Sequence, residues 1–294
     1  MSKLLERIAT VSHQAKASGH LLSLPTEIHH VEEGEFKFIV RVLGNLKRKK
    51  ESKAKDPNFN PFLPYEKEMF VGDAPPRHAL LLNKFNVVDN HLLIVTKEFE
   101  DQSSLLTKHD FEAMWSVLKD LDGLAFYNGG QIAGASQRHK HLQVVPTPLD
   151  IGGSMRTPFD KAISRSLEGA QPGEIRYCEA FPFVHTLMST IDCRDLQPTK
   201  AAELIFERYL SCLARLSDEL MPSAAVTSHM PYNLLATRDW MFMVPRKAEC
   251  FDGISMNSLA FAGGILVPRY ELLERVRSVS YQNNPRCKNL DLSH

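Results

Sequence analysis

The sequence lacks paired cysteines, an excess of charge of either sign and any long apolar run. Its five cysteines are scattered over 294 residues without a Cys-x-x-Cys pair, which argues against a disulfide framework and a cysteine-built zinc site. Lys plus Arg and Asp plus Glu number 35 each, so the chain lacks the positive charge of a general nucleic-acid-binding protein. No stretch approaches the roughly 18 apolar residues of a membrane helix, and the N-terminus lacks the apolar core of a secretory signal. These absences predict a cytoplasmic protein with neither a nucleic-acid nor a membrane partner.

What is present is an ordinary globular composition, with 43% hydrophobic and 24% charged residues. Apolar runs and alternating patterns predict strands over 36–42, 68–71, 78–82, 91–96, 124–130, 139–145, 232–236 and 240–244. Helical spacing predicts helices over 4–11, 108–121 and 199–220. The strands around the turn at 83–90 resemble those around 237–239, which indicates an internal duplication. We therefore predict an α+β fold: an antiparallel sheet from two related halves, residues 1–150 and 151–294, with helices on one face.

The segment with the strongest chemical signal is His139-Lys140-His141-Leu142-Gln143. Side chains alternate between the faces of a strand, so both histidines and the glutamine project to one side. A neutral imidazole is a good nucleophile near pH 7. We predict that His141 attacks a nucleotide α-phosphorus, that His139 holds a carbonyl or phosphate oxygen, and that Gln143 donates to a phosphate oxygen. Because Gln has no proton to relay, transfer to a second phosphate is favoured over hydrolysis.

A His-x-His pair alone is a weak signal, since about half a pair is expected by chance from 12 histidines. The competing functional interpretation is a metal site, but no Cys, Asp or Glu lies within the strand to complete the ligands. Two loops just upstream, Asn128-Gly129-Gly130 and Gly134-Ala135-Ser136-Gln137, favour the nucleotide interpretation. Small residues allow backbone N–H groups to approach phosphate oxygens, and Ser136 and Gln137 add side-chain donors.

These motifs together resemble the diadenosine polyphosphate phosphorylases (ATP adenylyltransferases), members of the histidine triad (HIT) superfamily and relatives of galactose-1-phosphate uridylyltransferase. The specific stretch is GASQRHKHLQ, preceded by NGG. Supporting stretches are LLNKF followed by HLLIVTKEF, Lys55-Asp56-Pro57, and NSLAFAG from Asn257. The resemblance runs from about Lys55 to Val267 and implies a HIT-like fold. It also implies cleavage of diadenosine tetraphosphate by phosphate to ADP and ATP, reversibly, with a divalent cation such as Mg²⁺.

The resemblance implies a set of site residues. His141 is the adenylylated nucleophile, with His139 and Gln143 beside it. The residues that contact substrate are Lys55, Asn83, Lys84, Asn128, Gly134, Ala135, Ser136, Gln137, Gln143, Asn257, Ser258, Leu259, Gly264 and Arg269. One departure lies at the C-terminal edge: Pro268 stands where the family's pattern has a lysine. Arg269 is therefore expected to supply that charge one position later.

Three classes of function stay open at this point. The first is the phosphorylase, which passes AMP from His141 to inorganic phosphate. The second is a sugar-1-phosphate nucleotidylyltransferase or a dinucleotide hydrolase, and Gln143 in place of a third triad histidine weighs against hydrolysis. The third is a nucleotide sensor without catalysis, against which both retained histidines argue. The partners expected are nucleotides and phosphate, and the sequence leaves the oligomeric state open.

Overall fold

An eight-stranded antiparallel sheet is the centre of the molecule, with strand order β3-β4-β5-β7-β6-β9-β10-β8. The structure is a computed structural model and describes residues 2–43, 59–220 and 230–278. The strands of this sheet are β3 (Phe70–Ala74), β4 (His78–Leu82), β5 (Leu92–Thr96), β6 (Gly123–Asn128), β7 (His141–Pro146), β8 (Thr186–Ser189), β9 (Tyr232–Ala236) and β10 (Trp240–Pro245). The strand β7, which carries His141 and Gln143 of the His-x-His-x-Gln motif, therefore lies in the interior of the sheet.

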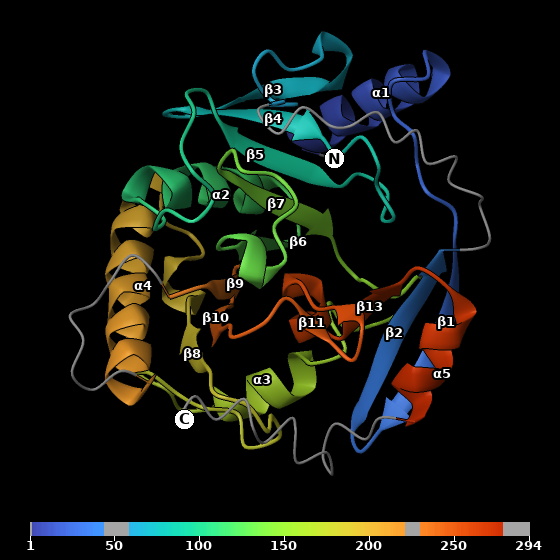
Figure 1. Ribbon diagram of the computed structural model, residues 1–294. Coiled ribbons are helices and arrows are strands. Elements are labelled where there is room, and N and C mark those ends of the chain that lie inside the picture. Colours follow the sequence, from blue (N-terminus) through green and yellow to red (C-terminus); the bar gives the residue numbers. More distant parts are fainter. Residues whose placement is uncertain (1, 44–58, 221–229, 279–294) are drawn as a thin grey trace.

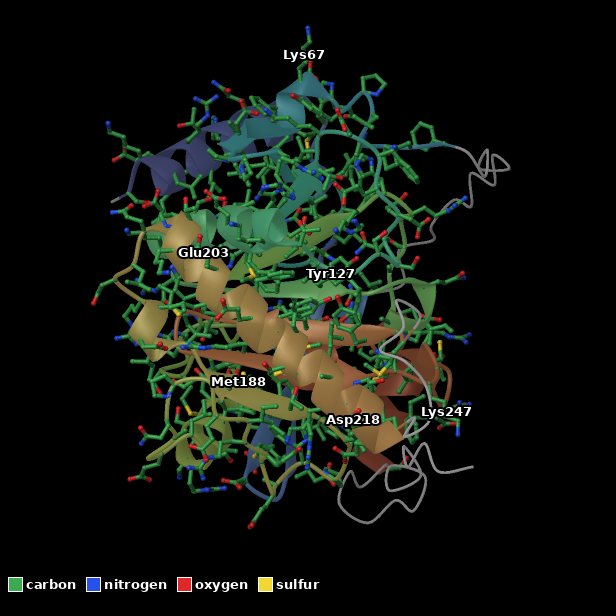
Figure 2. All side chains as sticks on the ribbon, turned by 90° about the vertical axis from the view of Figure 1, so that its left-hand side faces the viewer. Lys67, Tyr127, Met188, Glu203, Asp218 and Lys247 are labelled. Carbon is green, nitrogen blue, oxygen red and sulfur yellow. The ribbon has the colours of Figure 1, made fainter. Side chains whose placement is uncertain are left out.

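Three long helices cover one face of this sheet: α1 (Lys3–Ala17), α2 (Lys108–Asp120) and α4 (Pro198–Leu220). Figure 1 shows α2 and α4 side by side, and Figure 2 shows α4 crossing in front of the strands. Helix residues such as Trp115 and Ile205 share one buried cluster with Ile94 and Leu142 of the sheet. None of the helices that the structure describes is long and apolar enough to cross a bilayer.

A smaller, three-stranded sheet covers part of the opposite face (Figure 1). It consists of β1 (Thr26–Glu33), β2 (Phe36–Leu43) and β13 (Gly264–Val267), and β2 and β13 pair in parallel. The helices α3 (Asp160–Ser166) and α5 (Tyr270–Ser278), the hairpin of β11 (Cys250–Phe251) and β12 (Ile254–Ser255), and the short turns η1 (Lys67–Met69), η2 (Gln131–Ala133), η3 (Ile191–Cys193) and η4 (Ser258–Ala262) complete the described fold. Because the large sheet is covered on both faces, its strands β4 and β5 are buried at every position, which explains their unbroken apolar sequences.

Local sequence signals set the element ends. A reciprocal capping box begins α2, in which Thr107 and Asp110 bond to each other's backbone and side chain. Pro198 starts α4, at the position where a missing N–H costs least. The α+β class, the antiparallel sheet and the predicted long helices are confirmed. Strands β1, β8, β11, β12 and β13 were not predicted. Four of them are only two to four residues long, and the sequence of β1, TEIHHVEE, is mostly polar.

The strand order is consistent with two related halves. From the centre outward, β6, β7 and β5 on one side are matched by β9, β10 and β8 on the other. A long helix precedes each inner pair, since α2 leads into β6 and α4 leads into β9. The predicted correspondence of the β9–β10 hairpin with β4–β5 is therefore wrong, because β9 and β10 occupy the place of β6 and β7. A shared apolar–turn–apolar pattern is common to any hairpin, so it misled the comparison.

Candidate active site

The predicted alternation along β7 is present. Lys140, Leu142 and Val144 point to the helix-covered face, where Leu142 and Val144 join the core and Lys140 is fully buried. His141 and Gln143 project to the opposite face, toward the smaller sheet. His139 precedes β7 and forms an isolated bridge with Asp101. The motif therefore places its reactive side chains on one surface, as the sequence predicts.

His141 is held in one tautomer by the backbone beside it. Its Nδ1 lies 2.8 Å from the carbonyl oxygen of His139, so Nδ1–H donates to that oxygen and the lone pair stays on Nε2. Burial lowers the pKa of His141 from 6.5 to about 4, against the opposing effect of this hydrogen bond. The imidazole is therefore neutral at pH 7, with Nε2 available as a nucleophile.

The imidazole of His139 has a supporting position. Its Nε2 lies 2.8 Å from the carbonyl oxygen of Thr96 and 2.9 Å from the Thr96 hydroxyl. Its Nδ1 lies 2.9 Å from the Asn60 amide, and Phe62 packs against both histidine rings. The side chain of His139 thus holds a carbonyl, as predicted, but it is the backbone carbonyl of His139 that fixes the tautomer of His141.

Gln143 is the last residue of a short chain of hydrogen-bonded side chains. The Asn83 amide lies 3.2 Å from Nδ1 of His91, and Nε2 of His91 lies 2.9 Å from Oε1 of Gln143. Because Asn83 donates to Nδ1, the proton of neutral His91 is on Nε2 and is donated to Gln143. Burial lowers the pKa of His91 to about 4, which keeps this direction at neutral pH. The amide nitrogen of Gln143 is left as its donor toward a ligand.

Gln102, which no sequence motif indicates, holds the backbone of His141. The β6–β7 register pairs Phe126 with Gln143, and its continuation would pair Asn128 with His141. The buried amide of Gln102 lies there instead: its Oε1 accepts from the His141 N–H at 2.8 Å, and its Nε2 donates to the carbonyls of His141 at 3.1 Å and Asn128 at 3.0 Å. One side-chain amide therefore replaces a missing backbone pair where the two strands separate.

A cavity of about 500 Å³ opens beside Gln143, between the large sheet and β2 and β13. Its aromatic and polar lining includes Phe85, His91, Phe126 and the guanidinium-bearing Arg41 of β2. Arg41 donates to the carbonyl of Leu149 at 3.1 Å, and burial lowers the pKa of Arg41. The volume of the cavity is that of a small-molecule site, and its mixed lining suits an aromatic ligand with polar substituents.

Several residues predicted from the sequence meet at this cavity although they are far apart in the chain. They come from the β4–β5 turn, the loop before β7, β7 itself and the segment that leads into β13: Asn83, Ser136, Gln143, Asn257, Leu259 and Gly264. Gly134 has a φ of 90°, and a Cβ there would lie 3.0 Å from Cβ of Asn257. Glycine is therefore required where two of these loops approach each other.

Other predicted residues form a buried hydrogen-bond network beside the cavity and do not line it. Asn128 is buried, and its Oδ1 accepts from the backbone and hydroxyl of Ser258 at 3.0 and 2.7 Å and from Asn233 at 2.9 Å. Arg246 donates to Asn233 in turn. Asn128 and Ser258 thus join β6 to the 257–259 segment and do not line the cavity. The N–H groups of Gly134 and Ala135 are used in the turn itself, bonding to Gln131 and Gly130.

The remaining predicted residues lie outside the cavity lining. Ala135 and Gln137 flank Ser136 and are half-buried, and Lys84 pairs with Glu66 at 2.6 Å. Arg269 is exposed just before α5 and does not line the cavity, whose lining contains Arg41 of β2. Lys55 lies outside the described residues.

A metal site is not apparent among these side chains. Within the described residues, no group of three or more His, Cys, Asp or Glu is arranged to hold a metal ion. The cavity lining contains no carboxylate, which is the ligand that Mg²⁺ most often takes from a protein.

An antiparallel sheet with a neutral, oriented histidine on an interior strand fits a nucleotidyltransferase of HIT-like fold, and the family models agree with this class. Residues 1–165 match the family model of the Ap4A phosphorylase N-terminal domain, and residues 179–284 match that of the ATP adenylyltransferase C-terminal domain. This chain belongs to the Ap4A (diadenosine tetraphosphate) phosphorylase family and is an enzyme of this type. The boundary near residue 150 stays a prediction.

Relatives match over nearly the whole chain. Diadenosine 5',5'''-P1,P4-tetraphosphate phosphorylase 2 of Saccharomyces cerevisiae is 30% identical over 297 residues, which cover 89% of this chain and 86% of that protein. The crystal structure of yeast Ap4A phosphorylase Apa2 in complex with AMP is 26% identical, with a TM-score of 0.75, and covers 99% of this chain and 96% of that one. The same yeast protein in complex with Ap4A gives a TM-score of 0.76 at 24% identity, with the match covering 99% of this chain and 96% of that one.

Proposed function

We propose that this protein cleaves diadenosine tetraphosphate with inorganic phosphate to ADP and ATP, reversibly, through an adenylylated His141. The observation that carries the proposal is the orientation of His141, whose Nδ1–H is committed to the His139 carbonyl at 2.8 Å. That bond leaves Nε2 with the lone pair that a phosphorus atom requires. The yeast relative, which was crystallised with AMP and with Ap4A, supports nucleotides as the ligands.

The reaction proceeds in two displacements. Nε2 of His141 attacks the α-phosphorus next to one adenosine, the bond from that phosphorus to the bridging oxygen breaks, and ATP leaves with the electron pair. An oxygen of inorganic phosphate then attacks the same phosphorus, the N–P bond breaks, and ADP leaves while His141 regains its lone pair. Splitting one displacement into two in this way avoids a direct encounter of two polyanions.

Gln143 stabilises the charge that develops on the phosphoryl oxygens. His91 occupies its Oε1 at 2.9 Å, so its amide N–H groups are directed to those oxygens without any change of protonation. His91 is itself neutral, because burial lowers its pKa to about 4. This arrangement provides no general base to activate a water molecule through Gln143, which favours phosphate over water as the acceptor.

The 500 Å³ cavity receives the nucleoside whose phosphorus is attacked. Phe126 and Phe85 offer faces for the base, and Asn83 and Asn257 offer hydrogen bonds to the base and ribose. The lining has no carboxylate, so it does not fit a resident Mg²⁺ ion. A divalent cation therefore enters with the substrate, bound to its polyphosphate oxygens.

Chromatography of products tests the reaction. The protein is incubated with diadenosine tetraphosphate and Mg²⁺, with and without inorganic phosphate, and ADP plus ATP are expected only with phosphate. AMP plus ATP without phosphate would identify a hydrolase, and no product at all would refute both and leave sugar nucleotides to be tried.

The covalent step has its own test. Protein mixed with diadenosine tetraphosphate labelled in the adenine, without phosphate, is expected to retain one acid-labile AMP per active chain. His141→Ala should retain none and should turn over several orders of magnitude more slowly. Full turnover by His141→Ala would exclude the covalent route even if the products were as expected.

A further inference from the structure

Three buried tyrosines lie side by side on the helix-covered face of the large sheet, away from the proposed reaction: Tyr127 of β6, Tyr209 of α4 and Tyr232 of β9. The ring centroids of Tyr127 and Tyr232 are 5.9 Å apart, and those of Tyr209 and Tyr232 are 6.0 Å apart. Tyr127 is labelled in Figure 2, which views the molecule from the side of α4. Burying a hydroxyl costs free energy unless it is hydrogen-bonded, so the partners of these hydroxyls indicate what the tyrosines hold.

Tyr127 holds the backbone of the segment 102–106, which is neither helix nor strand. Its hydroxyl donates to the carbonyl oxygens of Gln102 and Ser104, and the distance to that of Ser104 is 2.9 Å. Burial raises the pKa of Tyr127, so the hydroxyl keeps its proton and stays a donor. Because the segment lacks the partners that a helix or a strand provides, this side chain satisfies backbone groups that burial would otherwise leave unpaired.

Tyr209 connects the same segment to the C-terminal part of the chain. Its hydroxyl accepts from the Leu106 N–H at 3.1 Å and lies 2.7 Å from the hydroxyl of Tyr232. Gly129 makes room for Tyr232, since a Cβ at Gly129 would lie 3.0 Å from the Tyr232 carbonyl oxygen and 3.2 Å from its ring. The Gly129 N–H donates to that carbonyl at 2.8 Å. This glycine of the Asn-Gly-Gly motif therefore serves the packing of the tyrosines.

Gln102, the first residue of the segment, is also the residue whose side chain holds His141. Its Oε1 accepts from the His141 N–H at 2.8 Å, and its Nε2 donates to the His141 carbonyl at 3.1 Å. The main chain of Gln102 is fixed at both ends, because its N–H donates to the Arg138 carbonyl at 2.8 Å and its carbonyl accepts from Tyr127. A single residue thus separates the Tyr127 hydroxyl from the backbone of the nucleophile.

We propose that Tyr127 is a positioning residue for His141, which acts through Gln102, and that Tyr209 supports the same segment from α4. The inference rests on the proposed function, since the position of His141 governs a rate only if His141 attacks phosphorus. Releasing the carbonyl of Gln102 lets its main chain shift, and the amide that holds His141 shifts with it. Neither tyrosine lines the cavity beside Gln143, so their removal slows AMP transfer and leaves substrate binding unchanged.

Tyr127→Phe tests this role, because it removes the hydroxyl and keeps the ring. The single-turnover rate of AMP transfer to the protein should fall about tenfold, less than the ~10²-fold cost of a 1 Å displacement, while KM stays at the wild-type value. Tyr209→Phe should give a smaller loss in the same direction. The matched control is Tyr177→Phe, whose hydroxyl lies at the surface and bonds to Arg215 at 2.7 Å. It should leave the rate unchanged.

Two further measurements show whether Tyr127 acts through Gln102. In a Gln102→Leu background, Tyr127→Phe should change the rate less than twofold, because residues that act through one contact are not additive. Amide hydrogen exchange followed by NMR reports the backbone directly and requires no substrate. The His141 N–H, which donates to Gln102, should exchange faster in Tyr127→Phe than in wild type. The Val144 N–H, farther along the same strand, should keep its rate.

The outcomes separate the positioning role from the reaction. If wild-type protein transfers no AMP, the proposed function fails, and exchange at His141 still decides whether Tyr127 holds the strand. If Tyr127→Phe keeps both the wild-type rate and the wild-type exchange at His141, the positioning role is refuted and the reaction stands. An equal loss of rate with and without Gln102 would also refute it, because Tyr127 would then act by another route. General loosening of the fold would speed exchange at Val144 as well, so it cannot imitate the expected result.

Discussion

Replacing Gln102 with leucine tests how the nucleophile is held. The amide makes three hydrogen bonds to backbone groups, two of them to His141 and one to Asn128, at 2.8, 3.1 and 3.0 Å. Gln102 is 2% exposed, and leucine of similar volume leaves little room for a replacing water molecule. Each buried group left without a partner costs about 1–3 kcal/mol. The Gly130 N–H also donates to the Asn128 carbonyl at 2.9 Å, so Gln102→Leu leaves two groups of His141 without a partner. It is therefore expected to lower the free energy of unfolding by roughly 2–6 kcal/mol.

The activity of Gln102→Leu should fall because His141 is displaced, and not because the substrate binds more weakly. The cavity residues stay in place, so KM should change little, whereas a shift of His141 by about 1 Å costs on the order of 10²-fold in rate. Urea unfolding gives the stability, and single-turnover transfer of AMP to the protein gives the rate under conditions where circular dichroism shows it folded. Gln171→Leu makes the same change on an exposed loop and should stay within about 0.5 kcal/mol of wild type. If Gln102→Leu matches that control in both measurements, the amide does not hold the strand.

Three further changes follow from the same contacts. Gln143→Ala should lower the rate of AMP transfer by about 10²–10³-fold, and an unchanged single-turnover rate would contradict its role as a phosphate donor. Burial lowers the pKa of His141 to about 4, so that transfer rate should fall only as the imidazole protonates near pH 4, and pH-jump kinetics with an acid limb near 6.5 would contradict the burial argument. Because the pKa values of His141 and His91 are lowered in the folded protein, the unfolded chain binds more protons below pH 6.5. The free energy of unfolding should therefore be highest above pH 6.5 and should fall from there toward pH 4, which urea unfolding at several pH values measures. Lys140→Met leaves the buried Asp110 carboxylate without the ammonium group that lies 2.8 Å from it and should lower the free energy of unfolding by about 3–5 kcal/mol. Lys108→Met at the surface should change that free energy very little.

The sequence predicted those parts of the site that depend on local periodicity. Alternation along residues 139–143 is a property of any strand, and it placed His141 and Gln143 on one face. Ser136, selected as a side-chain donor in a small-residue loop, and Asn257, implied by the family resemblance, both line the cavity. Arg269 did not reach it, since it precedes a helix at the surface. The residues with the clearest local pattern were thus the ones placed correctly.

Residues that act across the fold were not predictable in this way. Arg41 lies in a correctly predicted strand, but only the docking of β2 over the large sheet turns it into the cavity. His91 was not selected as a site residue, because nothing near it in sequence shows that Gln143 lies 2.9 Å away. An arginine or a histidine on an otherwise apolar strand is a usable signal, since burying either without a partner is costly.

The short segment 99–102, which is remote in sequence from β7, holds the residues at the start of that strand in place. Its residues pair with 138–141 along the backbone: the Lys140 N–H donates to the Glu100 carbonyl at 2.8 Å and the Gln102 N–H to the Arg138 carbonyl at 2.8 Å. Its side chains then reach both faces, since Glu100 contacts the ammonium of Lys140 at 3.1 Å and Phe99 packs on the ring of His139. Asp110 completes the anchor of Lys140; although burial acts to raise its pKa, hydrogen bonding from His78 and the charge of Lys140 hold that pKa well below its ordinary value. The position of His141 therefore depends on the charges around Lys140 as well as on the Gln102 amide. A substitution at Glu100 or Lys140 should alter the rate of AMP transfer although neither side chain contacts the substrate.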